Sequence, residues 1–328
     1  MRPRPLSCTA LALALFLSCP LPDPLARMGW SRAQAADIGV VATIAPVQGI
    51  LEAVMQDSGN HPRQLLPALA SPHLTQLRPS QAAMLEEADL VVRVSEGLET
   101  FLSRLSGPDA RGEHLLTLDE LPGIIRQPGR RAGLFDHVEA DGEGHDDGEE
   151  EHAHEHGTFD PHVWLDPHNG AIAARALADR LAELDPENGE IYEKNAEALA
   201  ARLRQIEDEI RQMLEPVRER RYLVLHDAYA AFEKRFGLAP AGAFAIGPER
   251  QPGPRRLEDL RHIVSKGDIA CMFTEPQIDS SRIDAIFADE SVRKAVLDPL
   301  GSGLPADADH YPRLLLEIAR SLRDCLSP

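Results

Sequence analysis

Short apolar runs alternate with amphipathic stretches along most of the chain, and this pattern predicts an α/β fold. Residues 38–46 and 88–97 are apolar and rich in β-branched side chains, as buried strands are, and residues 77–88 between them have a helical pattern. The second half repeats the arrangement, with strand-like runs at 221–227, 268–277 and 294–301. Strands that alternate with helices favour parallel sheets, whose binding sites lie at the carboxyl ends of the strands.

The clearest periodicity lies in the middle of the chain, where apolar residues recur at alternating steps of four and three. They are Tyr192, Ala196, Leu199, Leu203, Ile206, Ile210, Met213 and Val217. This stripe predicts one helix of about 30 residues, about 45 Å long. A coiled coil is the alternative, but the flanking α/β sequence favours a connecting helix over 185–217. We therefore expect an α/β lobe at 37–184 and a second at 218–328.

The first 36 residues have a different character. Arg2 and Arg4 precede an apolar run at 9–17, and small residues near Ala35 and Ala36 offer a cleavage site. This is the pattern of a secretory signal peptide, so we expect export to the periplasm. Lipid attachment at Cys19 is the alternative. No later stretch is apolar over enough residues to predict a transmembrane helix.

Export also bears on the cysteines and on the charge. Cys271 and Cys325 remain after cleavage, and an even pair in an oxidising compartment predicts a disulfide. The net charge of −19 and the lack of any basic run exclude a nucleic-acid partner.

Three histidines stand at the points where strand-like runs give way to loops. His73 follows such a run, His162 lies between aspartates in "DPHVWLDP", and His226 ends "YLVLH". Each alone is equally compatible with an ordinary loop histidine. Together, three imidazoles with a carboxylate or water form a ligand set for Zn²⁺. Asp298 is a candidate fourth ligand, and Glu275 is either an alternative ligand or a group that orients a histidine.

A segment at 136–157 interrupts the first half of the chain and contains ten carboxylates, five histidines and no Lys or Arg. Carboxylates raise the local concentration of cations, and the imidazoles could bind zinc weakly. A solvated acidic loop without any role in metal binding is the alternative. The histidines are His137, His145, His152, His154 and His156.

Several of these motifs together resemble the metal-binding solute-binding proteins of zinc and manganese ABC importers. The segments that carry the resemblance occur in family order over nearly all of the chain after residue 36. They are "ASPH…LRPS" at 70–80, "DPHVWLDP" at 160–167, "DPENGEIYEKNA" at 185–196, "HDAYAAFEKRFGL" at 226–238, "EPQIDSS" at 275–281 and "LDPLG" at 297–301.

The resemblance implies two (β/α) lobes with parallel sheets, joined by one long rigid helix, with one metal site in the cleft between the lobes. It implies His73, His162, His226 and Asp298 as ligands. Manganese-type members usually have a carboxylate where this chain has His226, so the resemblance favours a zinc-type member. Some zinc-type members have a glutamate just before the first histidine, where this chain has Pro72.

The function that follows is capture of Zn²⁺ outside the cytoplasmic membrane and its delivery to a membrane ABC permease, without a chemical step. We expect a monomer. A manganese or iron importer component is the first alternative. A secreted zinc hydrolase is a second, but the chain lacks the H-E-x-x-H motif. A metal-buffering or adhesive surface protein is a third, and it would follow from lipid attachment at Cys19.

Overall fold

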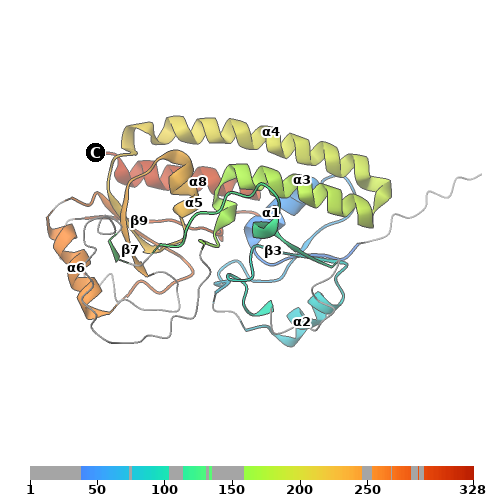
Figure 1. Ribbon diagram of the computed structural model, residues 1–328, viewed down its shortest axis with the longest axis horizontal. Coiled ribbons are helices and arrows are strands. Elements are labelled where there is room, and N and C mark those ends of the chain that lie inside the picture. The colour runs from blue at the N-terminus through green and yellow to red at the C-terminus, as the bar shows by residue number, and fades with distance from the viewer. Residues whose placement is uncertain are drawn as a thin grey trace, which may run out of the picture. The chain divides into compact units, whose positions relative to one another are not determined.

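The computed structural model contains two β-sheets and a layer of helices (Figure 1). The predicted signal peptide and the acidic segment 136–157 lie outside the residues that the structure describes. Among the described residues, no helix is long and apolar enough to cross a membrane. The structure describes residues 38–73, 76–102, 114–130, 133–134, 159–245, 253–266, 268–281, 287 and 292–328.

The first sheet has four parallel strands in the order β2-β1-β3-β4. Its central strands β1 and β3 are buried along their whole length, in agreement with the β-branched runs predicted there. The apolar run at 64–73 contributes only its first residue to a strand, the short β2, and the rest of it is a loop. The strands are β1 Val40–Ala42, β2 Arg63–Gln64, β3 Leu90–Arg93 and β4 Leu115–Thr117, with helices α1 Ala45–Val54 and α2 Pro79–Glu86.

The second sheet has five strands in the order β5-β7-β6-β8-β9. The described strands of this sheet pair in parallel, as expected, except at one edge, where β5 pairs with β7 in antiparallel orientation. The elements are β5 Gly133–Leu134, β6 Tyr222–His226, β7 Pro240–Ala245, β8 Cys271–Thr274 and β9 Arg293–Val296, with helices α5 Ala230–Phe236 and α6 Pro254–Ser265.

The predicted long helix is confirmed as α4, Gly189–Leu214, which has a short 3₁₀ turn at each end, Pro186–Asn188 and Glu215–Val217. Its apolar stripe is buried from Tyr192 to Leu214. The helix packs along α3, Pro167–Leu184, and α8, His310–Leu326, and it also contacts α1 and α5 (Figure 1). The helix therefore contacts elements of both halves of the chain, as a connecting helix does.

One buried apolar core connects the two sheets through these helices. It contains Val41 and Val92 of the first sheet and Val224 and Phe273 of the second. A smaller cluster lies under α6 and includes Phe244. Because the larger core is shared, the two sheets and the helices between them form one packed unit, and the loops at the strand ends are held in fixed relative positions.

Two elements cross over between the lobes: each belongs by sequence to one lobe but contacts the other. β5 belongs to the first segment, 37–184, but pairs with β7 of the second sheet. Helix α8 ends the second segment, 218–328, but packs against α1. The fit is close, because a Cβ atom added at Gly49 of α1 would lie 2.9 Å from the Cβ of His310.

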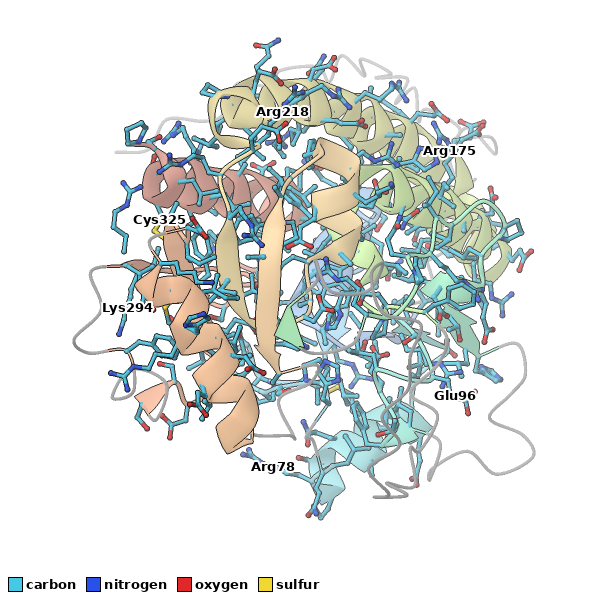
Figure 2. The ribbon with its side chains drawn as sticks, turned by 60° about the vertical axis from the view of Figure 1, so that its left-hand side comes forward. Arg78, Glu96, Arg175, Arg218, Lys294 and Cys325 are labelled. Carbon is cyan, nitrogen blue, oxygen red and sulfur yellow. A yellow bond between two sulfur atoms is a disulfide. The ribbon has the colours of Figure 1, made fainter. Side chains whose placement is uncertain are left out.

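The predicted disulfide is present between Cys271 and Cys325, whose Cα atoms lie 6.0 Å apart. It joins the first residue of β8 to the last turn of α8, and the yellow bond beside Cys325 marks it in Figure 2. The C-terminal helix is thus tied to the second sheet as well as packed on the first lobe.

Candidate metal centre

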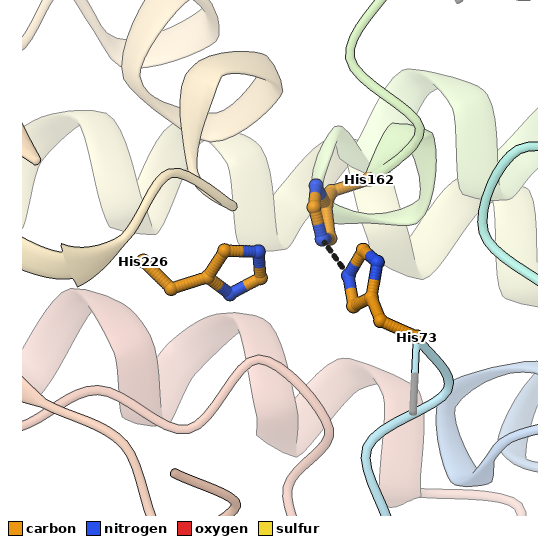
Figure 3. A group of neighbouring side chains, drawn as sticks. All are labelled: His73, His162 and His226. Carbon is orange, nitrogen blue, oxygen red and sulfur yellow. Dashed lines mark hydrogen bonds between the residues drawn. The ribbon is translucent and has the colours of Figure 1, made fainter. Parts of the chain in front are cut away.

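The three histidines singled out in the sequence come together from three separate segments (Figure 3). His226 is the last residue of β6, so its side chain projects where that strand ends. His162 directly precedes a 3₁₀ turn, Val163–Leu165, that leads into α3. His73 lies in the long loop that follows β2.

The distances between the rings are short. The Nε2 atoms of His73 and His162 lie 3.2 Å apart, and one ring nitrogen from each of the three histidines lies within 4.8 Å of the other two. The centroids of the His162 and His226 rings are 4.9 Å apart. The structure therefore shows the convergence of the three imidazoles, whereas their role as metal ligands stays a prediction.

Carboxylates behind two of the rings fix which nitrogen faces the centre. The Nδ1 atom of His162 lies 2.6 Å from Oδ1 of Asp160, which also accepts a hydrogen bond from the His162 backbone amide. The Nδ1 atom of His226 lies 3.3 Å from Oε2 of Glu275. A carboxylate at Nδ1 keeps the proton on that nitrogen and leaves Nε2 with a free lone pair, as in most metal-binding histidines.

The Nε2 atom of His226 is buried and has no hydrogen-bonding partner among the described residues. Buried polar atoms are almost always paired, because an unpaired one loses its hydration without compensation. An orphaned nitrogen in a group of three imidazoles is what a site for a metal ion would contain. This observation is independent of the distances between the rings.

The protonation of the two buried histidines differs because their neighbours differ. Burial lowers the pKa of His162 well below its usual value of 6.5, and the neighbouring His226 lowers it further. Burial acts in the same direction on His226, but the charge and hydrogen bond of Glu275 outweigh it and raise the pKa of that ring. His162 is therefore neutral and ready to bind a cation, whereas at His226 protons compete with the cation.

Burial also raises the pKa of the Asp160 carboxyl, to about 6. Close to neutral pH this group is still mostly ionised, so it can accept the Nδ1 proton of His162. Its place behind the histidine is a feature that the sequence analysis did not assign, although the motif "DPHVWLDP" contains it.

A cavity of about 20 Å³ lies among the three rings. Trp164, Glu275, Gln277 and Leu300 are among the other residues that line it. A space of this size holds about one water molecule or one ion, because a single water occupies about 10–15 Å³ by the same measure. A space of this size therefore fits a bare cation.

The structure does not bring Asp298 into this group. Among the described residues, the group whose ligand atoms lie close enough to hold a metal ion consists of the three histidines. The Asp298 carboxylate instead accepts three hydrogen bonds within its own loop and one from Gln277, which follows β8. The geometry thus gives no support to the expectation of Asp298 as the fourth ligand. Glu275 lies against His226 and outside the group of three, which agrees with the orienting role weighed for it in the sequence analysis.

Two arginines that the sequence analysis did not single out tie the segments of the site together. Arg235 of α5 donates two hydrogen bonds of 2.8 Å to the carboxylate of Asp166, four residues after His162. Arg130 contacts Asp227, the residue after His226, and lies 2.7 Å from Glu233. Asp166 and Arg235 both lie inside motifs that carry the family resemblance, whereas nothing in the sequence marks Arg130.

The expected weak metal site in the acidic segment falls on residues that the structure does not describe. His137, His145, His152, His154 and His156 all lie outside the described residues. The described residues on either side of the segment are Leu134 and Phe159. Leu134 pairs with β7 of the second sheet. Phe159 lies three residues before His162 and pairs with Pro128.

The chemistry of the centre is that of nitrogen coordination. Zn²⁺ binds imidazole nitrogen at about 2.0–2.1 Å, and tetrahedral geometry then separates two ligand nitrogens by about 3.3–3.4 Å. The 3.2 Å between the Nε2 atoms of His73 and His162 is close to that value. Three convergent imidazoles contributed by both halves of an α/β fold are the arrangement that the motifs imply for a metal-binding solute-binding protein.

The chain belongs to the family described as zinc-uptake complex component A, periplasmic, whose model matches residues 40–325. This confirms the resemblance to zinc-type solute-binding proteins drawn from the motifs. The high-affinity zinc uptake system protein ZnuA of Yersinia pestis is 37% identical over 298 residues, which cover 89% of this chain and 92% of that protein. The protein of the same name from Brucella suis is 35% identical over 314 residues, with coverages of 88% and 92%.

Solved structures agree with the fold. A crystal structure of a ZnuA deletion mutant with zinc bound superimposes with a TM-score of 0.69 at 27% identity, covering 89% of this chain and 99% of that one. The predicted fold class, two α/β lobes with a long helix between them, is thereby confirmed.

Proposed function

We propose that this protein captures Zn²⁺ in the periplasm and delivers it to a membrane ABC permease. The observation that carries the proposal is the convergence of three imidazoles, one of which has a buried and unpartnered Nε2 atom. The names of the relatives, which describe a high-affinity zinc uptake system, support the same function.

The donor set favours zinc over manganese or iron. Imidazole nitrogen suits Zn²⁺, whereas Mn²⁺ is bound more weakly by nitrogen and prefers carboxylate oxygen. Three nitrogens point to the centre, and the two nearest carboxylates, Asp160 and Glu275, are engaged with the Nδ1 atoms behind them. Zinc is also the metal in the solved deletion mutant of ZnuA.

The arrangement also favours binding over catalysis. A zinc hydrolase needs an open coordination position, room for its substrate and a general base. The cavity of about 20 Å³ leaves no room for a substrate, and Glu275, the candidate base, lies against His226. We therefore propose that the protein binds and releases zinc without a chemical step, as a monomer.

For the acidic segment 136–157, we propose weak and exchangeable zinc sites in addition to the tight one. The ten carboxylates and five histidines of that segment support this assignment. Calorimetry on a variant that lacks residues 136–157 tests it. Loss of the weak sites with the tight site intact is expected, and an unchanged number of weak sites would refute the assignment.

For the location, we propose a periplasmic protein released by signal cleavage near Ala35 or Ala36. The family description includes the word periplasmic. Mass spectrometry of the mature N-terminus distinguishes this from lipid attachment at Cys19, since the lipidated form would begin at that cysteine.

The binding site itself is tested by replacing its histidines singly. We expect His162→Ala and His226→Ala to weaken zinc binding by at least 100-fold, because each removes one of three protein ligands from the metal. His168→Ala is the matched control, since His168 is an exposed histidine near the same segment. Thermal denaturation without metal shows whether each variant is folded. Tight binding that persists in both site variants would refute the proposed function.

A further inference from the structure

The loop after β9 holds a carboxylate close to the candidate metal centre without directing it there. Oδ1 of Asp298 accepts hydrogen bonds from Nε2 of Gln277 at 2.7 Å and from the Leu300 amide at 3.0 Å. Oδ2 accepts two more from Ser302, from its backbone amide and from its hydroxyl, both at 2.6 Å. Four donors occupy the four lone-pair sites of an ionised carboxylate.

The residues that follow Asp298 in sequence and its hydrogen-bond partner Gln277 line the cavity. Gln277, which donates to the carboxylate, lines the cavity, and so do the next two residues of the loop, Pro299 and Leu300. The Pro299 carbonyl accepts a hydrogen bond from the indole of Trp164, which holds the loop against the segment that carries His162. Asp298 thus directly precedes one residue that lines the cavity, Pro299, and is hydrogen-bonded to another, Gln277.

The orientation of the Gln277 amide is fixed by chemistry. The Nε2 atom must face Asp298, because the opposite orientation would place the amide oxygen against a carboxylate oxygen. The amide oxygen Oε1 is then buried without a partner among the described residues. The Gln277 side chain thus donates to Asp298 although its own amide oxygen is left unpaired. This indicates that the hydrogen bond to Asp298 determines the position of the Gln277 side chain.

We propose that Gln277 and Ser302 determine metal specificity by withholding Asp298 from the metal. This inference rests on the proposed function and deepens it. With Asp298 held, the protein offers three nitrogens and excludes the carboxylate oxygen that Mn²⁺ needs in order to compete with Zn²⁺. With Asp298 released, the same site gains an oxygen ligand, and its preference for zinc decreases. Gln277 and Ser302 are positioning residues that act through Asp298.

The test is the selectivity of a double variant, Gln277→Met with Ser302→Ala, which removes both side-chain donors and leaves the backbone donors of the loop. Direct titration with Mn²⁺ and competitive titration with Zn²⁺ measure the two affinities. We expect Mn²⁺ affinity to rise at least tenfold and Zn²⁺ affinity to change by less than tenfold. Adding Asp298→Ala to the double variant should return Mn²⁺ affinity to the level of the unmodified protein.

An unchanged Mn²⁺ affinity in the double variant would overturn the inference, and so would a gain that persists when Asp298 is also replaced. The Asp298→Ala variant alone should keep Zn²⁺ affinity within tenfold of the unmodified protein, and a larger loss would show that Asp298 is already a ligand. Each of these results is distinct from failure of the proposed function, which would appear as an unmodified protein that binds no Zn²⁺ at the three histidines.

Discussion

Arg235 and Asp166 form a two-pronged ion pair that joins the second lobe to the segment carrying His162. Both hydrogen bonds are 2.8 Å long, and the Asp166 side chain is only 3% exposed. Asp166 also accepts a hydrogen bond from the His168 amide and so caps the start of α3. Arg235 belongs to α5, which begins four residues after His226. The pair thus fixes the separation of two of the three histidines.

Breaking this pair should destabilise the protein and loosen the site. Replacing Asp166 with Asn leaves the Arg235 guanidinium with only the more distant carboxylate of Glu207, at 3.8 Å. Removal of one member of a buried pair costs about 3–5 kcal/mol. Because Arg235 is partly exposed, we expect a loss nearer 3 kcal/mol in the free energy of unfolding. Chemical denaturation without metal measures it. The Arg235→Lys variant should also lose most of this stability, since lysine keeps the charge but cannot form the two-pronged contact.

The control for this prediction is Arg175, whose pair with Glu197 is exposed on the surface and which is labelled in Figure 2. Arg175→Ala should change the free energy of unfolding by about 0–1 kcal/mol. Equal losses in the Arg175 and Asp166 variants would show that the pair between the lobes has no special role.

Acidification should release zinc, and Glu275 should set the pH at which release begins. A histidine binds zinc only when neutral, so affinity falls as the pH drops through the pKa of His226, which Glu275 raises against the opposing effect of burial. Glu275→Gln removes that charge and should move the fall in affinity to lower pH. At pH 7.5 the same variant should bind zinc about 10- to 100-fold more weakly, because the oriented carboxylate strengthens the imidazole as a ligand.

Zinc titrations of both proteins between pH 5 and pH 8 check these two effects together. The curve for Glu275→Gln should lie at weaker affinity at high pH and bend at a more acidic pH. If both curves bend at the same pH, the coupling between Glu275 and His226 does not control release.

Asp160 should matter for affinity rather than for folding. Its contact of 2.6 Å with Nδ1 of His162 orients the ring, and loss of such a partner typically weakens metal binding by about 10- to 100-fold. We expect this loss for Asp160→Ala in competitive titrations with a zinc indicator. The exposed Asp179 is a suitable control, since its replacement by Ala should leave the affinity unchanged. Unchanged zinc binding by Asp160→Ala would contradict the orienting role.

The disulfide should contribute stability without affecting zinc. It closes a separation of 54 residues, for which loss of the cross-link costs about 2–4 kcal/mol. Cys271 is the first residue of β8, whereas Glu275 follows the opposite end of that strand. The double variant Cys271→Ala with Cys325→Ala should therefore melt at lower temperature, yet bind zinc with the affinity of the unmodified protein. A large loss of affinity would mean that the cross-link positions the site.

Much of the fold was predictable because the apolar pattern is strong where elements are long or fully buried. The stripe from Tyr192 to Val217 predicted α4, the β-branched runs predicted β1 and β3, and the apolar run at 221–227 predicted β6. Strand β7 was missed because Ala and Gly alternate there and Pro240 begins it. Its place between β5 and β6 comes from burial in the sheet rather than from the preference of its residues for strands.

The histidines were predictable and their surroundings were not. His226 ends an apolar run, and binding sites of parallel α/β sheets lie at the carboxyl ends of the strands. Three of the four hydrogen bonds of Asp298 depend on how the chain turns between Asp298 and Ser302, which composition does not reveal. Arg130 likewise reaches Asp227 across 97 residues of sequence, a distance over which periodicity carries no information.

The most direct test of the account is anomalous X-ray scattering at the zinc edge from crystals of the protein grown with Zn²⁺. The account predicts one strong peak about 2.0–2.1 Å from the Nε2 atoms of His73, His162 and His226, with the Asp298 carboxylate still held by Gln277 and Ser302. A peak elsewhere on the described residues, or one bound by fewer than these three imidazoles, would contradict it.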